Sequence, residues 1–76
     1  MSNVPTEIKL NAIAANLNAL HALLTVAATR TSEAHQLIQT GECDGAIGAV
    51  LGVDAFLDDA EALYVATLAL HRSRAI

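Results

Sequence analysis

The feature that most constrains this chain is a series of apolar and small residues that recur alternately three and four positions apart. The series is Leu10, Ile13, Leu17, Leu20, Leu24, Ala27, Thr31, Ala34 and Ile38. A 3.5-residue repeat keeps one stripe of a helix facing a partner helix, so the series predicts a long helix with a seam of the coiled-coil type. Leu23 and Leu37 lie beside this seam and widen it. Pro5 or Thr6 suits the first turn and Gly41 the end, which places the helix over about residues 6–39.

A second helical stripe follows and is broader than one seam. Its members are Ala49, Val50, Val53, Phe56, Leu57, Ala60, Leu63, Tyr64, Thr67 and Leu70. Arg72 and Arg74 come at its end, where cations suit the helix dipole. We therefore expect a turn over residues 40–44 and a second helix over about residues 45–72. The predicted fold is all-α, an antiparallel hairpin of two long helices that forms one domain over residues 1–76.

Four glycines fall between the two stripes, at Gly41, Gly45, Gly48 and Gly52. On a helix the last three would share one face, although each interior glycine costs about 1 kcal/mol relative to alanine. We expect close helix packing to offset that cost, because the facing end of the first helix is also rich in small residues. The alternative is that residues 41–52 form a loop or a frayed turn, with the second helix beginning near Val53.

The chain is short, and its composition predicts that it pairs. It has 76 residues, of which 54% are hydrophobic, and one cysteine, Cys43. Small domains without a disulfide or a metal gain stability from oligomerisation, and two helices alone cannot cover both stripes. We expect a homodimer in which two hairpins form a four-helix bundle. The residues expected in the core and dimer seam are Leu10, Ile13, Leu17, Leu20, Leu24, Phe56, Leu57, Leu63, Tyr64 and Leu70.

The sequence contains no catalytic motif. His21, His35 and His71 lack the i, i+4 spacing of a helical zinc site, and Cys43 lies between two carboxylates that disfavour a thiolate. We expect no enzymatic activity, no metal and no cofactor. His21 and His35 fit the boundary of the seam; the alternative is a pH-sensitive contact across the dimer.

The charge is sparse and acidic. The net charge is −4, and the four lysines and arginines are scattered. A nucleic-acid partner is not expected, since binding the phosphate backbone needs a clustered basic face. The sequence shows neither an export signal nor a run of about 20 apolar residues, so we expect a cytoplasmic protein with no membrane partner. The densest charge cluster is Asp54, Asp58, Asp59 and Glu61, which predicts either a solvated face or a docking face for a basic partner.

Residues 59–64, DAEALY, followed by Leu68 resemble the second helix of Rop-type helical hairpins. The resemblance covers residues 59–68 only. It implies a hairpin that dimerises into a four-helix bundle and binds paired RNA loops. The Rop-type RNA face uses polar, basic and aromatic residues of the first helices, and this chain offers Asn11, Asn18 and Gln36 there, but no aromatic residue.

Two functions follow from these features. The first is a small non-enzymatic interaction protein, a regulator, adaptor or inhibitor that binds another protein. It would bind through the acidic cluster or through apolar surface at the open end of the hairpin, where Leu10, Ile13, Tyr64 and Leu70 gather. The second is a Rop-like RNA-binding dimer.

Overall fold

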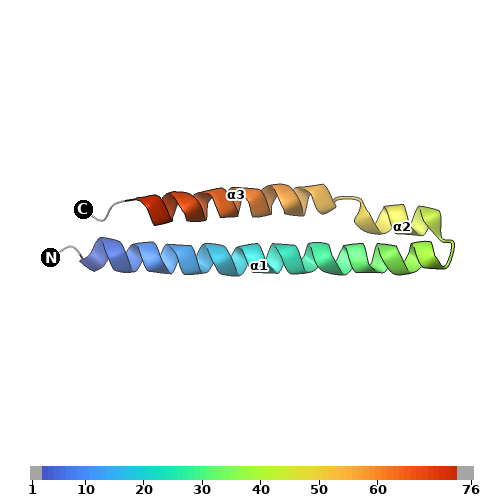
Figure 1. Ribbon diagram of the computed structural model, residues 1–76, viewed down its shortest axis with the longest axis horizontal. Coiled ribbons are helices and arrows are strands. Elements are labelled where there is room, and N and C mark those ends of the chain that lie inside the picture. Colours follow the sequence, from blue (N-terminus) through green and yellow to red (C-terminus); the bar gives the residue numbers. More distant parts are fainter. Residues whose placement is uncertain (1–2, 74–76) are drawn as a thin grey trace.

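The computed structural model describes residues 3–73, and these residues form three helices and no strand. They are α1 (Asn3–Gln39), α2 (Cys43–Val50) and α3 (Val53–Arg72). α2 and α3 run back along α1, so both ends of the chain lie at one end of the molecule and the turn lies at the other (Figure 1). The predicted all-α hairpin is therefore confirmed. α1 begins before the expected start near residue 6 and ends at Gln39.

The turn after α1 is a left-handed glycine cap. Gly41 has a φ of +83°. The Glu42 amide donates to the Leu37 carbonyl at 2.9 Å and the Gly41 amide donates to the Ile38 carbonyl at 3.1 Å. This pair of bonds satisfies the last carbonyls of the helix, and glycine suits the position because it has no Cβ to clash in the left-handed region.

The returning arm is broken, which corrects the prediction of one helix over residues 45–72. Leu51 is extended and Gly52 is left-handed, with a φ of +87°. Two features favour a break here. Gly52 adopts this conformation without a steric penalty, and the Arg30 guanidinium donates to the Leu51 carbonyl at 3.2 Å, which satisfies a group that the break leaves free.

The glycines do not provide the close helix packing that their spacing suggested. A Cβ built at Gly48 or Gly52 would meet nothing within 4 Å, and one at Gly45 would make ordinary contacts, the nearest at 3.6 Å from Leu37 Cδ1. Two of the four glycines instead supply left-handed backbone, at the turn and at the break.

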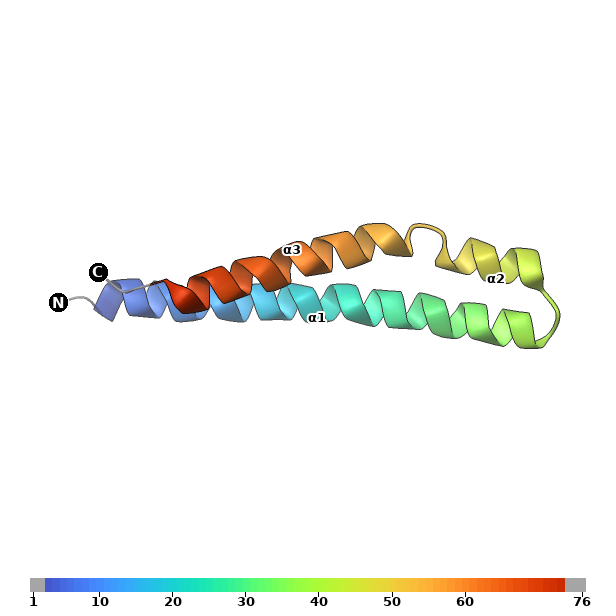
Figure 2. The ribbon, with the colours of Figure 1, turned by 45° about the horizontal axis from the view of Figure 1, so that its top comes forward.

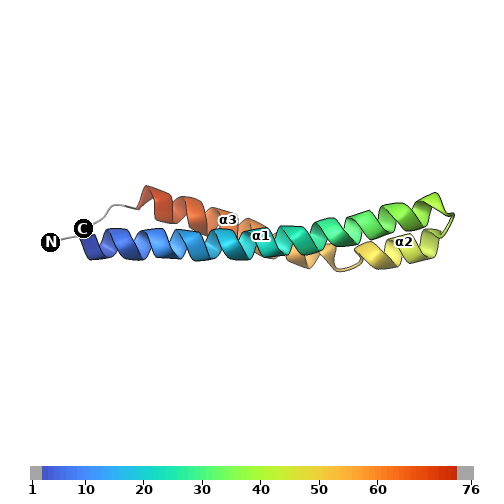
Figure 3. The same cartoon turned by 90° about the horizontal axis from the view of Figure 1, so that it is seen from below.

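One line of side chains joins α1 to the returning arm, and we call it the hairpin seam. It alternates in steps of three and four on both sides, and Figures 2 and 3 show the arm winding along α1. Its α1 members are Lys9, Ile13, Asn16, Leu20, Leu23, Ala27, Arg30, Ala34 and Leu37. Its arm members are Ala46, Ala49, Val53, Phe56, Ala60, Leu63, Thr67 and Leu70. Among the residues whose side chains are described, the buried hydrophobic ones are Ala27, Ala46, Val53 and Ala60.

Three polar members of the hairpin seam, Lys9, Arg30 and Thr67, are held by specific contacts. The Arg30 guanidinium carbon lies 5.4 Å from the centre of the Phe56 ring, within range of a cation–π interaction. The Thr67 hydroxyl donates to the Leu63 carbonyl at 2.7 Å. Lys9 Nζ donates to the Ser73 carbonyl at 2.7 Å and so supports the C-terminus of α3. These contacts let polar side chains occupy a seam that is only one layer deep.

The left-handed break generates the first prediction. Gly52→Ala places a Cβ in a conformation with a φ of +87° and should lower the free energy of unfolding by about 1–2 kcal/mol. Gly48→Ala is the matched control, because Gly48 lies inside α2 with open space around it, and it should raise the free energy of unfolding by up to about 1 kcal/mol. Urea unfolding followed by circular dichroism measures both. If both variants stabilise the protein, the arm is a continuous helix and the break is wrong.

Candidate interaction surface

On α1 the hairpin seam shares four residues with the expected seam and differs from it at five. It keeps Ile13, Leu20, Ala27 and Ala34, but replaces the other five members with the residue that precedes each one. The ten residues expected in the core and dimer seam accordingly divide into two sets. Ile13, Leu20, Phe56, Leu63 and Leu70 are partly buried between α1 and α3. The other five are exposed: Leu10 at 60%, Leu17 at 48%, Leu24 at 46%, Leu57 at 50% and Tyr64 at 54%.

The exposed set belongs to one side of the hairpin. Each of its members directly follows a member of the hairpin seam, as Leu24 follows Leu23 and Tyr64 follows Leu63. A step of one residue turns a right-handed helix by about 100°, always in the same sense along the chain. Because α1 and α3 run in opposite directions, the residues that follow the hairpin seam on the two helices point to the same side of the hairpin. With Ile38, 47% exposed, they form a surface that we call the apolar face. It consists of Leu10, Leu17, Leu24, Ile38, Leu57 and Tyr64.

Two neighbouring rows of side chains on α1 differ in polarity, and the more polar row is the one that faces the returning arm. The row of the hairpin seam that contains Lys9 consists of Lys9, Asn16, Leu23, Arg30 and Leu37, whereas the row beside it, on the apolar face, consists of Leu10, Leu17, Leu24, Thr31 and Ile38. A stable soluble helix normally turns its more apolar row inward. The arrangement is consistent only if the apolar face also has a cover.

The exposed area supports the same inference. A compact protein of 7.9 kDa exposes about 4,400 Å², and this chain exposes 5546 Å². The excess is about 1,100 Å², which is more than the roughly 800 Å² that each partner buries in a standard protein interface. The molecule is correspondingly elongated, with extents of 62 × 14 × 12 Å.

The acidic cluster is exposed and extends from the border of the apolar face, where Asp54 and Glu61 lie three or four residues from Leu57, around the outer side of α3. Asp58 and Val65, seven positions apart, lie on α3 opposite the hairpin seam, with Asp54 and Glu61 beside them. Asp59 falls on the flank opposite the apolar face. The side chains of Ile47, Leu51 and Val65 are 55%, 67% and 56% exposed. The outer surface of the arm therefore combines three carboxylates with exposed aliphatic side chains.

The ionisable residues do not assemble into a reactive site. Among the residues that the structure describes, no three His, Cys, Asp or Glu side chains lie close enough to hold a metal ion. His21, His35 and His71 are exposed, and the exposed Cys43 is the first residue of α2. No contact in the described residues brings a histidine to a carboxylate or to the thiol.

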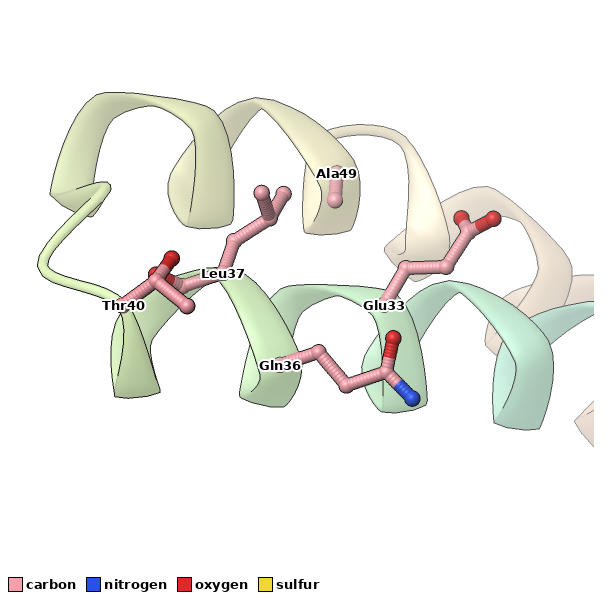
Figure 4. Close-up of a pocket in the computed structure, with 5 residues that line it drawn as sticks. All are labelled: Glu33, Gln36, Leu37, Thr40 and Ala49. Carbon is pink, nitrogen blue, oxygen red and sulfur yellow. The ribbon is translucent and has the colours of Figure 1, made fainter.

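A shallow hollow of about 410 Å³ lies between the end of α1 and α2. Leu37 points from α1 toward α2, while Glu33, Gln36 and Thr40 lie around the rim (Figure 4). Ala49 contributes the α2 side, and Glu33 is the only ionisable residue of the lining. The hollow therefore offers no pair of groups for acid–base or nucleophilic chemistry.

α1 is long and apolar enough, by length and composition, to cross a membrane. A window of 18 residues between Thr6 and Gln39 has a mean hydropathy of 1.4, and 6% of it is buried. This is weak evidence for a span, because helices that pack against protein have the same composition. α1 also carries Asn11, Asn16, Asn18 and His21, and polar groups of this kind are costly to place in lipid.

No family model, no curated protein and no solved structure matches this chain. The predicted seam did not include Lys9, Asn16 and Arg30, and it placed Leu23 and Leu37 beside the seam, whereas all five residues line the hairpin seam. A signal was present, since these residues keep the same 3.5-residue period one position earlier in the chain. Two adjacent periodic rows on one helix indicate two partners.

Proposed function

We propose that this protein acts by association and not by catalysis. Two copies pair through the apolar face, which turns two hairpins into a four-helix bundle. The bundle then binds another protein as a small regulator, adaptor or inhibitor. The observation that carries the proposal is the row of exposed leucines beside a more polar row of α1, the row that contains Lys9, Asn16 and Arg30.

The size of the apolar face fits a second copy of the chain. Its six residues run the length of α1 and much of α3, and all are between 46% and 60% exposed. Each leucine or tyrosine that is fully covered contributes roughly 1.5–3 kcal/mol. A twofold pairing covers the six residues on both copies, and the sum is comparable with the stability of a whole small domain.

The outer surface of the arm is the surface that supports binding of a further protein. It stays outside a bundle formed through the apolar face, because Asp58 and Val65 lie opposite the hairpin seam. It offers aliphatic contacts beside Asp54, Asp58 and Glu61, so a partner with a basic, partly apolar surface fits it. RNA fits it poorly, since an acidic surface repels the phosphate backbone.

The pairing is tested by a charge placed on the apolar face. Leu24→Glu should weaken self-association at least about 100-fold, because it removes leucine burial from both copies and introduces carboxylates at the interface. Sedimentation equilibrium over nanomolar to micromolar concentrations measures the change. Val26→Glu is the matched control, since Val26 is similarly exposed, at 41%, on the opposite flank of α1.

The expected results are a dimer for the native chain and for Val26→Glu, and a monomer for Leu24→Glu. A native chain that stays folded and monomeric at micromolar concentration would refute the pairing. Equal association of both variants would show that the copies meet through some other surface.

The protein partner is tested by comparing variants in the native cell. Tagged protein should recover a partner that is lost when Asp58→Asn and Glu61→Gln are combined, because these carboxylates lie on the proposed binding surface. Asp59→Asn is the control on the other flank and should keep the partner. Quantitative mass spectrometry of the purified complexes gives the readout. Identical recovery with all three proteins would contradict binding at this surface.

The RNA alternative has its own measurement. The four scattered cations and net charge of −4 lead us to expect no mobility shift with paired RNA loops, even at low salt where electrostatic binding is strongest. A shift that weakens steeply as salt is raised would favour the Rop-like function instead.

A further inference from the structure

We infer that the two copies pair head to tail, so that the turn of each hairpin lies beside the open end of its partner. This inference rests on the proposed dimer and adds the direction of pairing. A twofold dimer through the apolar face has two possible arrangements. In the head-to-head arrangement both turns lie at one end; in the head-to-tail arrangement they lie at opposite ends.

The register of the hairpin locates the residues of the apolar face along its length. Lys9 reaches Ser73, Arg30 reaches Leu51, and Leu37 lies beside Gly45. On this register Tyr64 lies level with the α1 segment near Leu17, and Leu57 lies level with the segment near Leu24.

Four members of the apolar face therefore occupy the middle of the hairpin: Leu17, Leu24, Leu57 and Tyr64. Leu10 lies toward the open end and Ile38 toward the turn. A head-to-tail axis must cross the middle of the long dimension. The apolar face satisfies that condition, since the central four residues meet their counterparts and Leu10 comes level with the α1 segment between Leu24 and Ile38 of the second copy.

The distribution of charge then separates the two arrangements. The turn end carries Glu42 and Asp44, both exposed, and no lysine or arginine occurs between Arg30 and Arg72. The open end carries Lys9 and Arg72, with Glu7 as the one carboxylate among the described residues there. Charge thus changes sign along the molecule.

Head-to-head pairing would place two acidic turns side by side, with four carboxylates, Glu42 and Asp44 of each copy, and no lysine or arginine at the turn end. Head-to-tail pairing places each acidic turn beside the cations of the other copy, and opposite charges at this range attract.

The chain carries its own probe for this arrangement. Cys43 is its only cysteine and is exposed at the tip of the hairpin. A nitroxide spin label on Cys43 of the native dimer reports the separation of the two turns by pulsed electron paramagnetic resonance. In a molecule 62 Å long, head-to-tail pairing puts the labels roughly 50 Å apart along helices that rise about 1.5 Å per residue. Head-to-head pairing puts them within about 20 Å, because adjacent helices lie 8–10 Å apart.

A second measurement checks the first, because in it head-to-tail pairing gives the short distance between labels and head-to-head pairing gives the long one. Protein labelled with a donor dye on Cys43 is mixed with Ser73→Cys in a Cys43→Ser background that carries an acceptor dye at the open end. Head-to-tail pairing brings the two dyes together in mixed dimers and gives high energy transfer. Head-to-head pairing gives low transfer.

The outcomes separate the two proposals. A long spin–spin distance with high transfer in the mixed dimer supports head-to-tail pairing. A dimer with a short spin–spin distance and low transfer overturns the direction of pairing and leaves the dimer intact. A chain that sediments as a monomer at the concentrations used overturns both.

Discussion

The structure depends on a single line of side chains between α1 and the returning arm. The buried hydrophobic residues along that line are Ala27, Ala46, Val53 and Ala60, and each retains 5–7% of its surface. A hairpin of this kind has no interior in the sense of a globular domain, because every large side chain has one flank in water. Its stability on its own is correspondingly limited, since burial of apolar area is the main favourable term in folding. Any function must be compatible with a hairpin that leaves many large apolar side chains exposed to water.

The same seven-residue repeat that builds the hairpin seam also builds a second surface. Ile13 and Leu20 share α1 with Leu10, Leu17 and Leu24, and only the first two face α3. Since the more apolar row is the one left outside, the helix has the pattern of a bundle member with two neighbours and has only one in the monomer. A second copy is the simplest neighbour with a matching surface. This accounts for the long exposed helix without assigning it to a membrane.

The irregular features of the arm are explained by its backbone conformation and by the contacts of Arg30. Gly52 accepts a left-handed conformation, Leu51 leaves its carbonyl to Arg30, and Arg30 lies over Phe56. These contacts with Leu51 and Phe56 explain why an arginine, Arg30, occupies a position in the hairpin seam. The ionisable groups elsewhere remain dispersed over exposed surfaces, which is why the proposed function rests on the shape and polarity of surfaces.

The sequence by itself determined the fold class, because periods of three and four over such a length admit only helices, and two helical stripes around a glycine-marked turn give an antiparallel hairpin. It also identified which residues are available to bury. It did not determine which row of α1 faces α3, since Leu10–Leu17–Leu24 and Lys9–Asn16–Leu23 have the same period and differ by one position. Nor did it place the break, because the spacing of Gly45, Gly48 and Gly52 suits one helix face as well as a left-handed interruption. Only the tertiary structure decided these points, through contacts between residues far apart in sequence: Arg30 with Leu51 and Phe56, and Lys9 with Ser73.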